Sequence, residues 1–153
     1  MPNKLKFMVR TATSDDCDFV TSSWLKSNLD NPTYRHIAPD AYKLHHGRII
    51  ENYLADPDTA CVIAYDPENP HFVYGWACWQ RDTSCVHYCY TRQKFRRLGV
   101  ASQLLTLAGV TQRVTVLTTH WSQRGDLLFR AMGATQVYDP YLAWSRAGGV
   151  TLR

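Results

Sequence analysis

The stretch SCVHYCYTRQKFRRLGVASQLLTLAGV, residues 84–110, changes its periodicity halfway along and decides the fold. Up to Thr91 it predicts a β-strand, because β-branched and aromatic residues are frequent and no proline or glycine interrupts them. From Arg97 onward it predicts a helix, because apolar residues recur at helical spacing, namely Val100, Leu104, Leu107 and Ala108. A strand therefore leads into a helix at this point of the chain.

Basic residues crowd the turn between this strand and this helix: Arg92, Lys94, Arg96 and Arg97. We expect Gly99 in the first turn of the helix, where a missing side chain leaves backbone N–H groups reachable. The start of a helix attracts anions, above all phosphates. From Arg92 to Arg130 the chain holds seven basic residues and one acidic residue, so the net charge of +4 is concentrated here. The sequence therefore predicts a phosphate-binding turn.

Length and composition set the class of protein. A chain of 153 residues that is 45% hydrophobic can bury a core, so we expect residues 1–153 to form a single globular domain. No apolar run approaches the roughly 20 residues needed to span a bilayer, and the start is too polar for a secretory signal. The five cysteines are odd in number and show no disulfide spacing. These features favour a cytoplasmic protein with reduced thiols.

The rest of the chain alternates between strand and helix patterns. Caps, breakers and periodicity predict seven strands at 6–12, 60–65, 72–80, 84–91, 113–119, 134–138 and 141–145. They predict four helices at 13–29, 40–56, 97–108 and 122–132. The strands ending at Thr91 and Thr119 should be parallel neighbours, because a helix connects them. We expect a mixed α/β sheet.

This order of elements resembles the GNAT N-acetyltransferases over nearly the whole chain. The most specific motif is Arg96-Arg97-Leu98-Gly99-Val100-Ala101, which fits the phosphate-binding signature of that family. The opening VRTATSDD also resembles its first strand and helix start. The resemblance implies a mixed central sheet of about seven strands flanked by about four helices, with a splayed parallel strand pair at the cofactor cleft.

The resemblance also implies acetyl-CoA as co-substrate and acetyl transfer to an amine by direct attack on the thioester. The backbone amides of residues 97–101 would bind the pyrophosphate, and the strand edge at residues 89–91 would pair with the pantetheine arm. The sequence does not identify the acceptor amine. The residues expected to bind the cofactor are Cys89, Tyr90, Thr91, Arg96, Arg97, Leu98, Gly99, Val100, Ala101 and Ser122.

The second half departs from the family pattern at the catalytic positions. Phe129 stands where the family often has a tyrosine that protonates the leaving thiolate, and it has no proton to give. The strand predicted at residues 84–91 contains no carboxylate, and the nearest acidic residue before it is Asp82. His87 is the nearest titratable replacement for a base, and alternation places it on one face with Cys89. Tyr138 is the other catalytic candidate, with Tyr141 and His120 as further groups near the acetyl end.

Several alternatives stay open. A strand histidine such as His87 is more often a hydrogen-bonded structural residue than a base. Cys85 and Cys89 lie about 13 Å apart in an extended strand, too far to share a zinc ion, so we expect no metal site. The chain could be a GNAT-like domain without catalysis that serves as a binding or structural protein, as in some phage-encoded relatives. Excess basic residues such as Arg124 and Arg130 leave open a nucleic-acid partner or an acyl-CoA-using enzyme that modifies nucleic acid. A homodimer is also left open.

Overall fold

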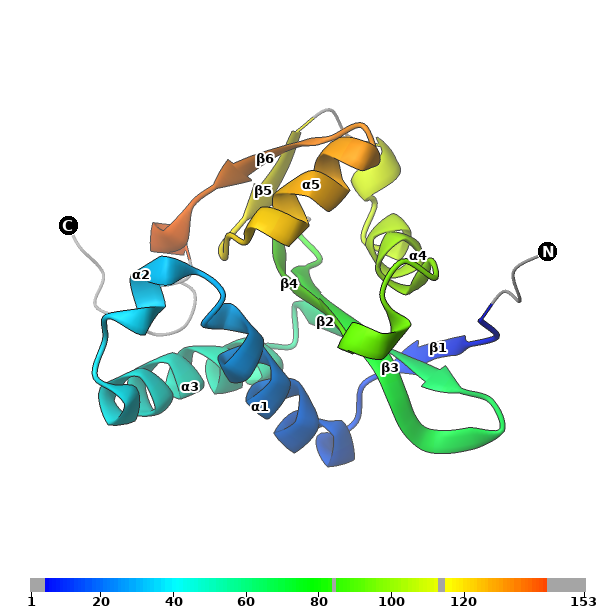
Figure 1. Cartoon of the computed structure of the whole chain (residues 1–153), viewed down its shortest axis with the longest axis horizontal. Helices are drawn as coiled ribbons and strands as arrows, with labels where there is room; N and C mark the ends of the chain where they lie inside the picture. Colours follow the sequence, from blue (N-terminus) through cyan, green and yellow to red (C-terminus); the bar gives the residue numbers. More distant parts are fainter. Residues whose placement is uncertain (1–4, 84, 113–114, 143–153) are drawn as a thin grey trace.

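A six-stranded sheet forms the centre of the molecule (Figure 1). The computed structural model describes residues 5–83, 85–112 and 115–142. The strands lie in the order β1-β2-β3-β4-β5-β6, with the bounds β1 Met8–Thr11, β2 Thr59–Asp66, β3 Asn69–Gln80, β4 Val86–Thr91, β5 Thr115–Thr118 and β6 Thr135–Tyr138. Strands β1 to β4 are antiparallel, whereas β4, β5 and β6 are parallel. The predicted mixed α/β sheet is confirmed.

The predicted count of seven strands is wrong for the described residues. Residues 140–142 are helical where the seventh strand was expected to begin, and residues 143–145 lie outside the described ranges. An Asx-type contact helps explain the turn, because the Asp139 carboxylate accepts hydrogen bonds from the backbone N–H groups of Tyr141 and Leu142, at 3.1 Å each. Residues 113–114 of the expected fifth strand also lie outside the described ranges.

Helices cover both faces of the sheet (Figure 1). Their bounds are α1 Cys17–Asn28, α2 Pro32–Arg35, α3 Pro39–Ala55, α4 Val100–Leu107 and α5 Gln123–Ala131. Helices α1 and α3 pack on one face, and α4 and α5 pack on the other. The short helix α2 was not predicted; the side chain of Asn31 caps it by accepting from the N–H of Thr33.

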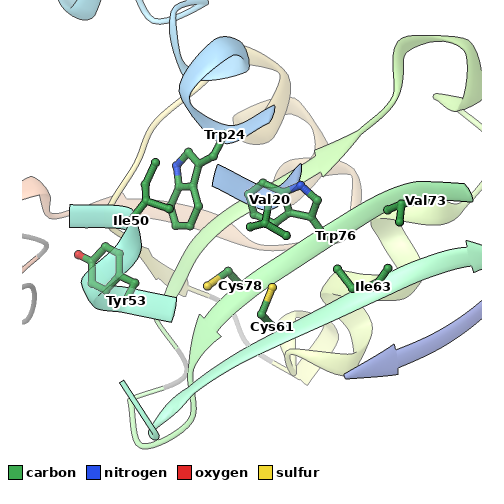
Figure 2. Close-up of a cluster of buried hydrophobic side chains, with 9 residues drawn as sticks. All are labelled: Val20, Trp24, Ile50, Tyr53, Cys61, Ile63, Val73, Trp76 and Cys78. Carbon is green, nitrogen blue, oxygen red and sulfur yellow. The ribbon is translucent and has the colours of Figure 1, made fainter. Parts of the chain in front are cut away.

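The first layer holds the larger aromatic core. Figure 2 shows Val20 and Trp24 from α1 and Ile50 and Tyr53 from α3, gathered over β2 and β3. Trp76 lies beneath them on β3, tilted against Trp24 with ring centroids 5.2 Å apart. Burial of such side chains contributes about 1.5–3 kcal/mol each and makes this layer the rigid support of the sheet.

A capped turn at the N-terminal end of α1 ties this layer to the edge strand β1. The carboxylate of Asp16 accepts a hydrogen bond from the N–H of Thr13 at 2.7 Å. The same carboxylate forms a two-pronged ion pair with Arg10 of β1, at 2.6 and 2.9 Å. The hydrogen bond from Arg10 is the main cause that lowers the pKa of Asp16.

A β-bulge lies near the start of β4. Val86 pairs with Trp79 of β3 and Tyr88 pairs with Cys78, so His87 is an extra residue between them. As a result Cys89 packs towards α4, whereas the ring of His87 stacks on Tyr53 of α3. The prediction that His87 shares a face with Cys89 is therefore wrong.

Candidate functional site

The parallel strands β4 and β5 part immediately after they meet. Their register contains the single pair Val86 and Thr118, supplemented by a hydrogen bond from the N–H of Thr119 to the carbonyl of Val86 at 3.3 Å. Beyond it, β4 continues to Thr91 while β5 has ended at Thr118. Among the described residues, β4 has no strand partner along this last part of its edge. This is the splayed pair that the sequence predicted.

A cavity of about 870 Å³ occupies the opening. Its walls come from both layers of the protein. On the α4 side it is lined by the turn before α4, by α4 itself and by α5, including Arg97, Ala101 and Phe129. On the α1 side it is lined by Ser27 and Tyr88, with His120 at the end of β5. The cavity therefore reaches from one face of the sheet to the other through the gap between β4 and β5.

The turn before α4 has the backbone shape of an anion-binding loop. Arg97 and Gly99 both have positive φ angles, 65° and 87°. Gly99 is the residue that precedes the helix, which begins at Val100 rather than at Arg97 as predicted. The left-handed conformation of Gly99 is the reason for this later start, because a helix cannot include it. No side chain caps the helix and its first turn holds no acidic residue, so the first N–H groups remain available.

Most residues of the predicted phosphate site lie together at this turn. Arg96, Arg97, Gly99, Val100 and Ala101 all line the cavity. An added Cβ at Gly99 would meet no heavy atom within 4 Å, so the space in front of the helix is open. The side chain of Leu98 is exposed and lies outside the cavity lining. The turn therefore combines reachable N–H groups with two guanidinium groups.

Further predicted residues lie deeper in the cleft. Cys89, Tyr90 and Thr91 line the cavity from the edge of β4. Burial raises the pKa of the Cys89 thiol to about 12, so this group stays protonated at neutral pH. Ser122 also lines the cavity, and its hydroxyl caps α5 by accepting a hydrogen bond from the N–H of Gly125 at 3.0 Å.

The two predicted catalytic residues lie in different settings. His87 is 1% exposed, and its nitrogens lie 3.1 Å from the side-chain oxygen of Gln80 and 3.0 Å from the hydroxyl of Thr119. Tyr138 is 41% exposed at the end of β6 and does not line the cavity. His87 is among the residues that line the cavity, although its side chain is buried, and the role of each residue as a base or an acid stays a prediction.

Other polar groups face the cavity on the α1 side. The hydroxyl of Tyr88 lies 2.8 Å from the hydroxyl of Ser27, and burial is the main cause that raises the pKa of Tyr88. Asp30 and Arg35, from the connection around α2, complete this wall. Periodicity could not predict that Ser27, Asp30 and Arg35 lie opposite β4, because they are distant in sequence and carry no motif. His120 was singled out only because it follows a strand.

Phe129, which the motif count placed at the position of the family's tyrosine, lines the cavity. It is buried, and it packs with Leu105 of α4 and Val116 of β5. It brings an apolar ring and no hydroxyl to this wall of the cavity. Phe129 therefore offers no proton donor to the cavity.

The overall arrangement matches solved structures of acetyltransferases. A crystal structure of a predicted acetyltransferase with acetyl-CoA from Clostridium acetobutylicum aligns with a TM-score of 0.60 and 16% identity, over 86% of this chain and 92% of that one. The chain has the fold of the GNAT acetyltransferases. A structure of histone acetyltransferase HPA2 and related acetyltransferase from Corynebacterium glutamicum aligns with a TM-score of 0.59 and 18% identity, over 84% of each chain. A putative acetyl transferase from Pyrococcus furiosus aligns with a TM-score of 0.52 and 16% identity, over 97% of this chain and 95% of that one.

At these identities the likeness shows the GNAT fold and leaves the activity to be argued from the site. No protein-family model and no curated protein sequence matches the chain. Within the described ranges, no helix is both long and apolar enough to cross a membrane. The same ranges contain no group of three or more histidine, cysteine or acidic residues that could hold a metal ion.

Proposed function

We propose that this protein is an acetyl-CoA-dependent N-acetyltransferase. The observation that carries the proposal is the cavity that passes through the splayed sheet, with a basic turn at one end and polar groups at the other. Such a passage lets two substrates approach one reacting carbon from opposite faces. The likeness of its fold to solved acetyltransferase structures supports this assignment.

The basic turn would hold the phosphates of acetyl-CoA. The N–H groups of residues 99–101 at the start of α4 would donate to the pyrophosphate, and Arg96 and Arg97 would neutralise its charge. The edge of β4 at residues 89–91 that faces away from β3 would pair with the amides of the pantetheine arm, because no strand of the described residues lies along it. The thioester would then lie in the gap between β4 and β5.

The acceptor amine would enter on the α1 side, near Ser27, Tyr88 and His120. Its nitrogen attacks the thioester carbonyl, a C–N bond forms, the C–S bond breaks, and the amine proton passes to a base or to water. Proximity of the two substrates supplies most of the acceleration in such a reaction. A thiol with a pKa of about 8.5 is a fair leaving group, so the lack of a hydroxyl at Phe129 does not forbid turnover.

Titration calorimetry with CoA tests the binding half of this proposal. Gly99→Asp places a negative charge in the open space before the helix and should abolish binding. Gly99→Asn is the matched control, because it has the same size and tolerates a positive φ but lacks the charge. A Gly99→Asp variant that binds CoA as tightly as the unchanged protein would exclude this site. Thiol release with a panel of primary amines then tests transfer.

Phe129 favours a second candidate, a GNAT-fold domain that binds CoA without transferring its acyl group. This candidate predicts that the protein binds CoA but shows no acyl transfer to amines, peptides or nucleic acids.

The nucleic-acid alternative rests only on basic residues, and Arg96, Arg97 and Arg124 line the same cavity. It predicts binding to RNA or DNA that weakens steeply with salt and competes with CoA. Turnover with a small amine would disfavour both.

A further inference from the structure

A chain of buried side chains crosses the gap between β4 and β5, and its first link is Gln80 at the end of β3. The amide nitrogen of Gln80 donates to the carboxylates of Asp58 and Asp56, at 3.0 and 3.3 Å. Carboxylates only accept hydrogen bonds, so they fix the orientation of the amide. Its oxygen must then face His87, whose Nε2 lies 3.1 Å away. His87 therefore carries its proton on Nε2.

Each following link is determined by the one before it. A neutral His87 protonated on Nε2 has a lone pair on Nδ1, which lies 3.0 Å from the hydroxyl of Thr119. The hydroxyl has one proton and gives it to His87. The Nδ1 of His120 lies 3.0 Å from the same oxygen, so it must be the donor there. His120 is thus the opposite tautomer to His87.

The last link reaches helix α3. The Nε2 of His120 carries the remaining lone pair and lies 2.9 Å from the Nε2 of His46, which donates to it. All three rings are buried, at 7% exposure for His46, 1% for His87 and 6% for His120. Every hydrogen bond therefore points in one direction, from His46 towards the two aspartates. Ordered chains of this kind strengthen one another in a buried setting.

This series of hydrogen-bonded side chains lies where the backbone pairing between β4 and β5 ends. One backbone pair joins β4 to β5. The hydrogen bond between the side chains of Thr119 and His87 links the two strands just beyond that pair. His87 is the extra residue of the bulge, and His120 lines the cavity on the α1 side. His120 also packs edge-on against Trp24, with ring centroids 5.2 Å apart. The chain thus connects the strand separation to the cavity wall.

We propose that Thr119, His46, His87 and His120 are positioning residues that set the separation of β4 and β5 at the acyl end of the cleft. This role rests on the proposed function, because the spacing matters only if an acyl-pantetheine group lies between the strands. Thr119 does not line the cavity and acts through His87 and His120. The turn before α4, which would hold the phosphates, contributes no residue to this series of hydrogen-bonded side chains.

The test compares two ligands in an isosteric variant. Thr119→Val keeps the volume and removes the hydroxyl, leaving both histidine nitrogens without their partner. Its affinity for acetyl-CoA should fall by about tenfold, whereas its affinity for ADP, which has the pyrophosphate but no pantetheine, should stay within about twofold. Thr119→Ser restores the hydroxyl and should restore acetyl-CoA binding. Unchanged acetyl-CoA affinity in Thr119→Val would overturn the proposal.

Nitrogen-15 NMR of the histidine rings gives a second readout that needs no ligand. At pH 7 His46 and His87 should be protonated on Nε2 and His120 on Nδ1, and Thr119→Val should remove this order. A different set of tautomers in the unchanged protein would overturn the proposal. If neither acetyl-CoA nor ADP binds, the proposed function fails, while the tautomers still decide whether the chain is ordered. If Thr119→Val does not fold, Gln80→Met, which removes the anchor at the far end, takes its place with the same expected results.

Discussion

Lowering the pH from 7 to 5 should destabilise the protein through His46. This side chain is buried between α1, α2 and α3, and the groups that face it are uncharged at neutral pH. They are Tyr34 and Tyr42, whose rings stack or pack edge-on against it, the amide of Asn28 and the ring of His120. A proton added to His46 would therefore meet no compensating negative charge among these neighbours.

Burial lowers the pKa of His46 from its ordinary value of 6.5 to about 4. Between these two values the unfolded chain binds more protons than the folded protein, so stability is complete above pH 6.5 and is lost as the pH falls. For a group with these two pKa values, the free energy of unfolding falls by about 2 kcal/mol between pH 7 and pH 5. The pKa of His120 is lowered as well, mainly by burial, so it adds to the loss.

Urea unfolding at pH 7, 6 and 5 measures this effect. His46→Gln cannot titrate but keeps an N–H donor towards His120, so it should remove about 2 kcal/mol of the pH dependence. His45→Gln is the control, because His45 is exposed on the same helix and should leave the dependence unchanged. Equal dependence on pH in the unchanged protein and in His46→Gln would refute the reasoning.

Three further predictions concern other parts of the molecule. Phe129→Tyr should leave CoA affinity unchanged and raise turnover by about tenfold, because a positioned acid assists the leaving thiolate; thiol release that stays at the original rate would contradict this. Asp16→Asn should lower the free energy of unfolding by about 1 kcal/mol at pH 7, through the loss of its bonds to Arg10 and Thr13. Because the pKa of Asp16 is lowered in the folded state, the difference from the unchanged protein should shrink as the pH falls below its ordinary value of 3.8, and a difference that grows there would be inconsistent. Gly75→Ala should cost about 1–3 kcal/mol in urea unfolding, because its Cβ would collide with the carbonyl oxygen of Tyr90. Gly47→Ala should instead leave the free energy of unfolding unchanged or raise it by up to about 1 kcal/mol, because Gly47 lies within α3 and its Cβ would be 4.0 Å from Leu25. Similar losses of stability in both glycine variants would contradict the packing described.

The fold was predictable because its deciding signals are local. The change of period around Gly99 located the strand, the turn and the helix from adjacent residues alone. Cap and breaker residues placed α1, α3 and α5 to within a few residues, because the chemistry of a helix end is contained in one turn. The last predicted strand failed because Asp139 and Pro140 favour a turn that continues into helical residues, which alternation of apolar residues does not reveal.

The cleft was only half predictable, for a physical reason. The residues on the α4 side belong to one motif, and a motif can be read in order along the chain. Ser27, Asp30 and Arg35 reach the other wall through the packing of α1 and the entry into α2, so their positions depend on tertiary structure. The bulge at His87 depends on the pairing of β4 with β3 and leaves no signal in single-sequence periodicity.

The bulge has a consequence for how this site can change over generations. Before His87 an even-numbered residue of β4 faces α4, and after it the odd-numbered residues do, as Val86 and Cys89 show. Because His87 is the unpaired extra residue, its deletion would make Val86 and Tyr88 consecutive residues on opposite faces, and Tyr88 would still point towards Ser27. A one-codon deletion after Tyr88, where β4 pairs regularly with β3, would instead move each following side chain of the strand to the opposite face, which no single substitution can do. Insertions and deletions in β4, more than replacements, are the genetic route by which this cleft would acquire a new chemistry.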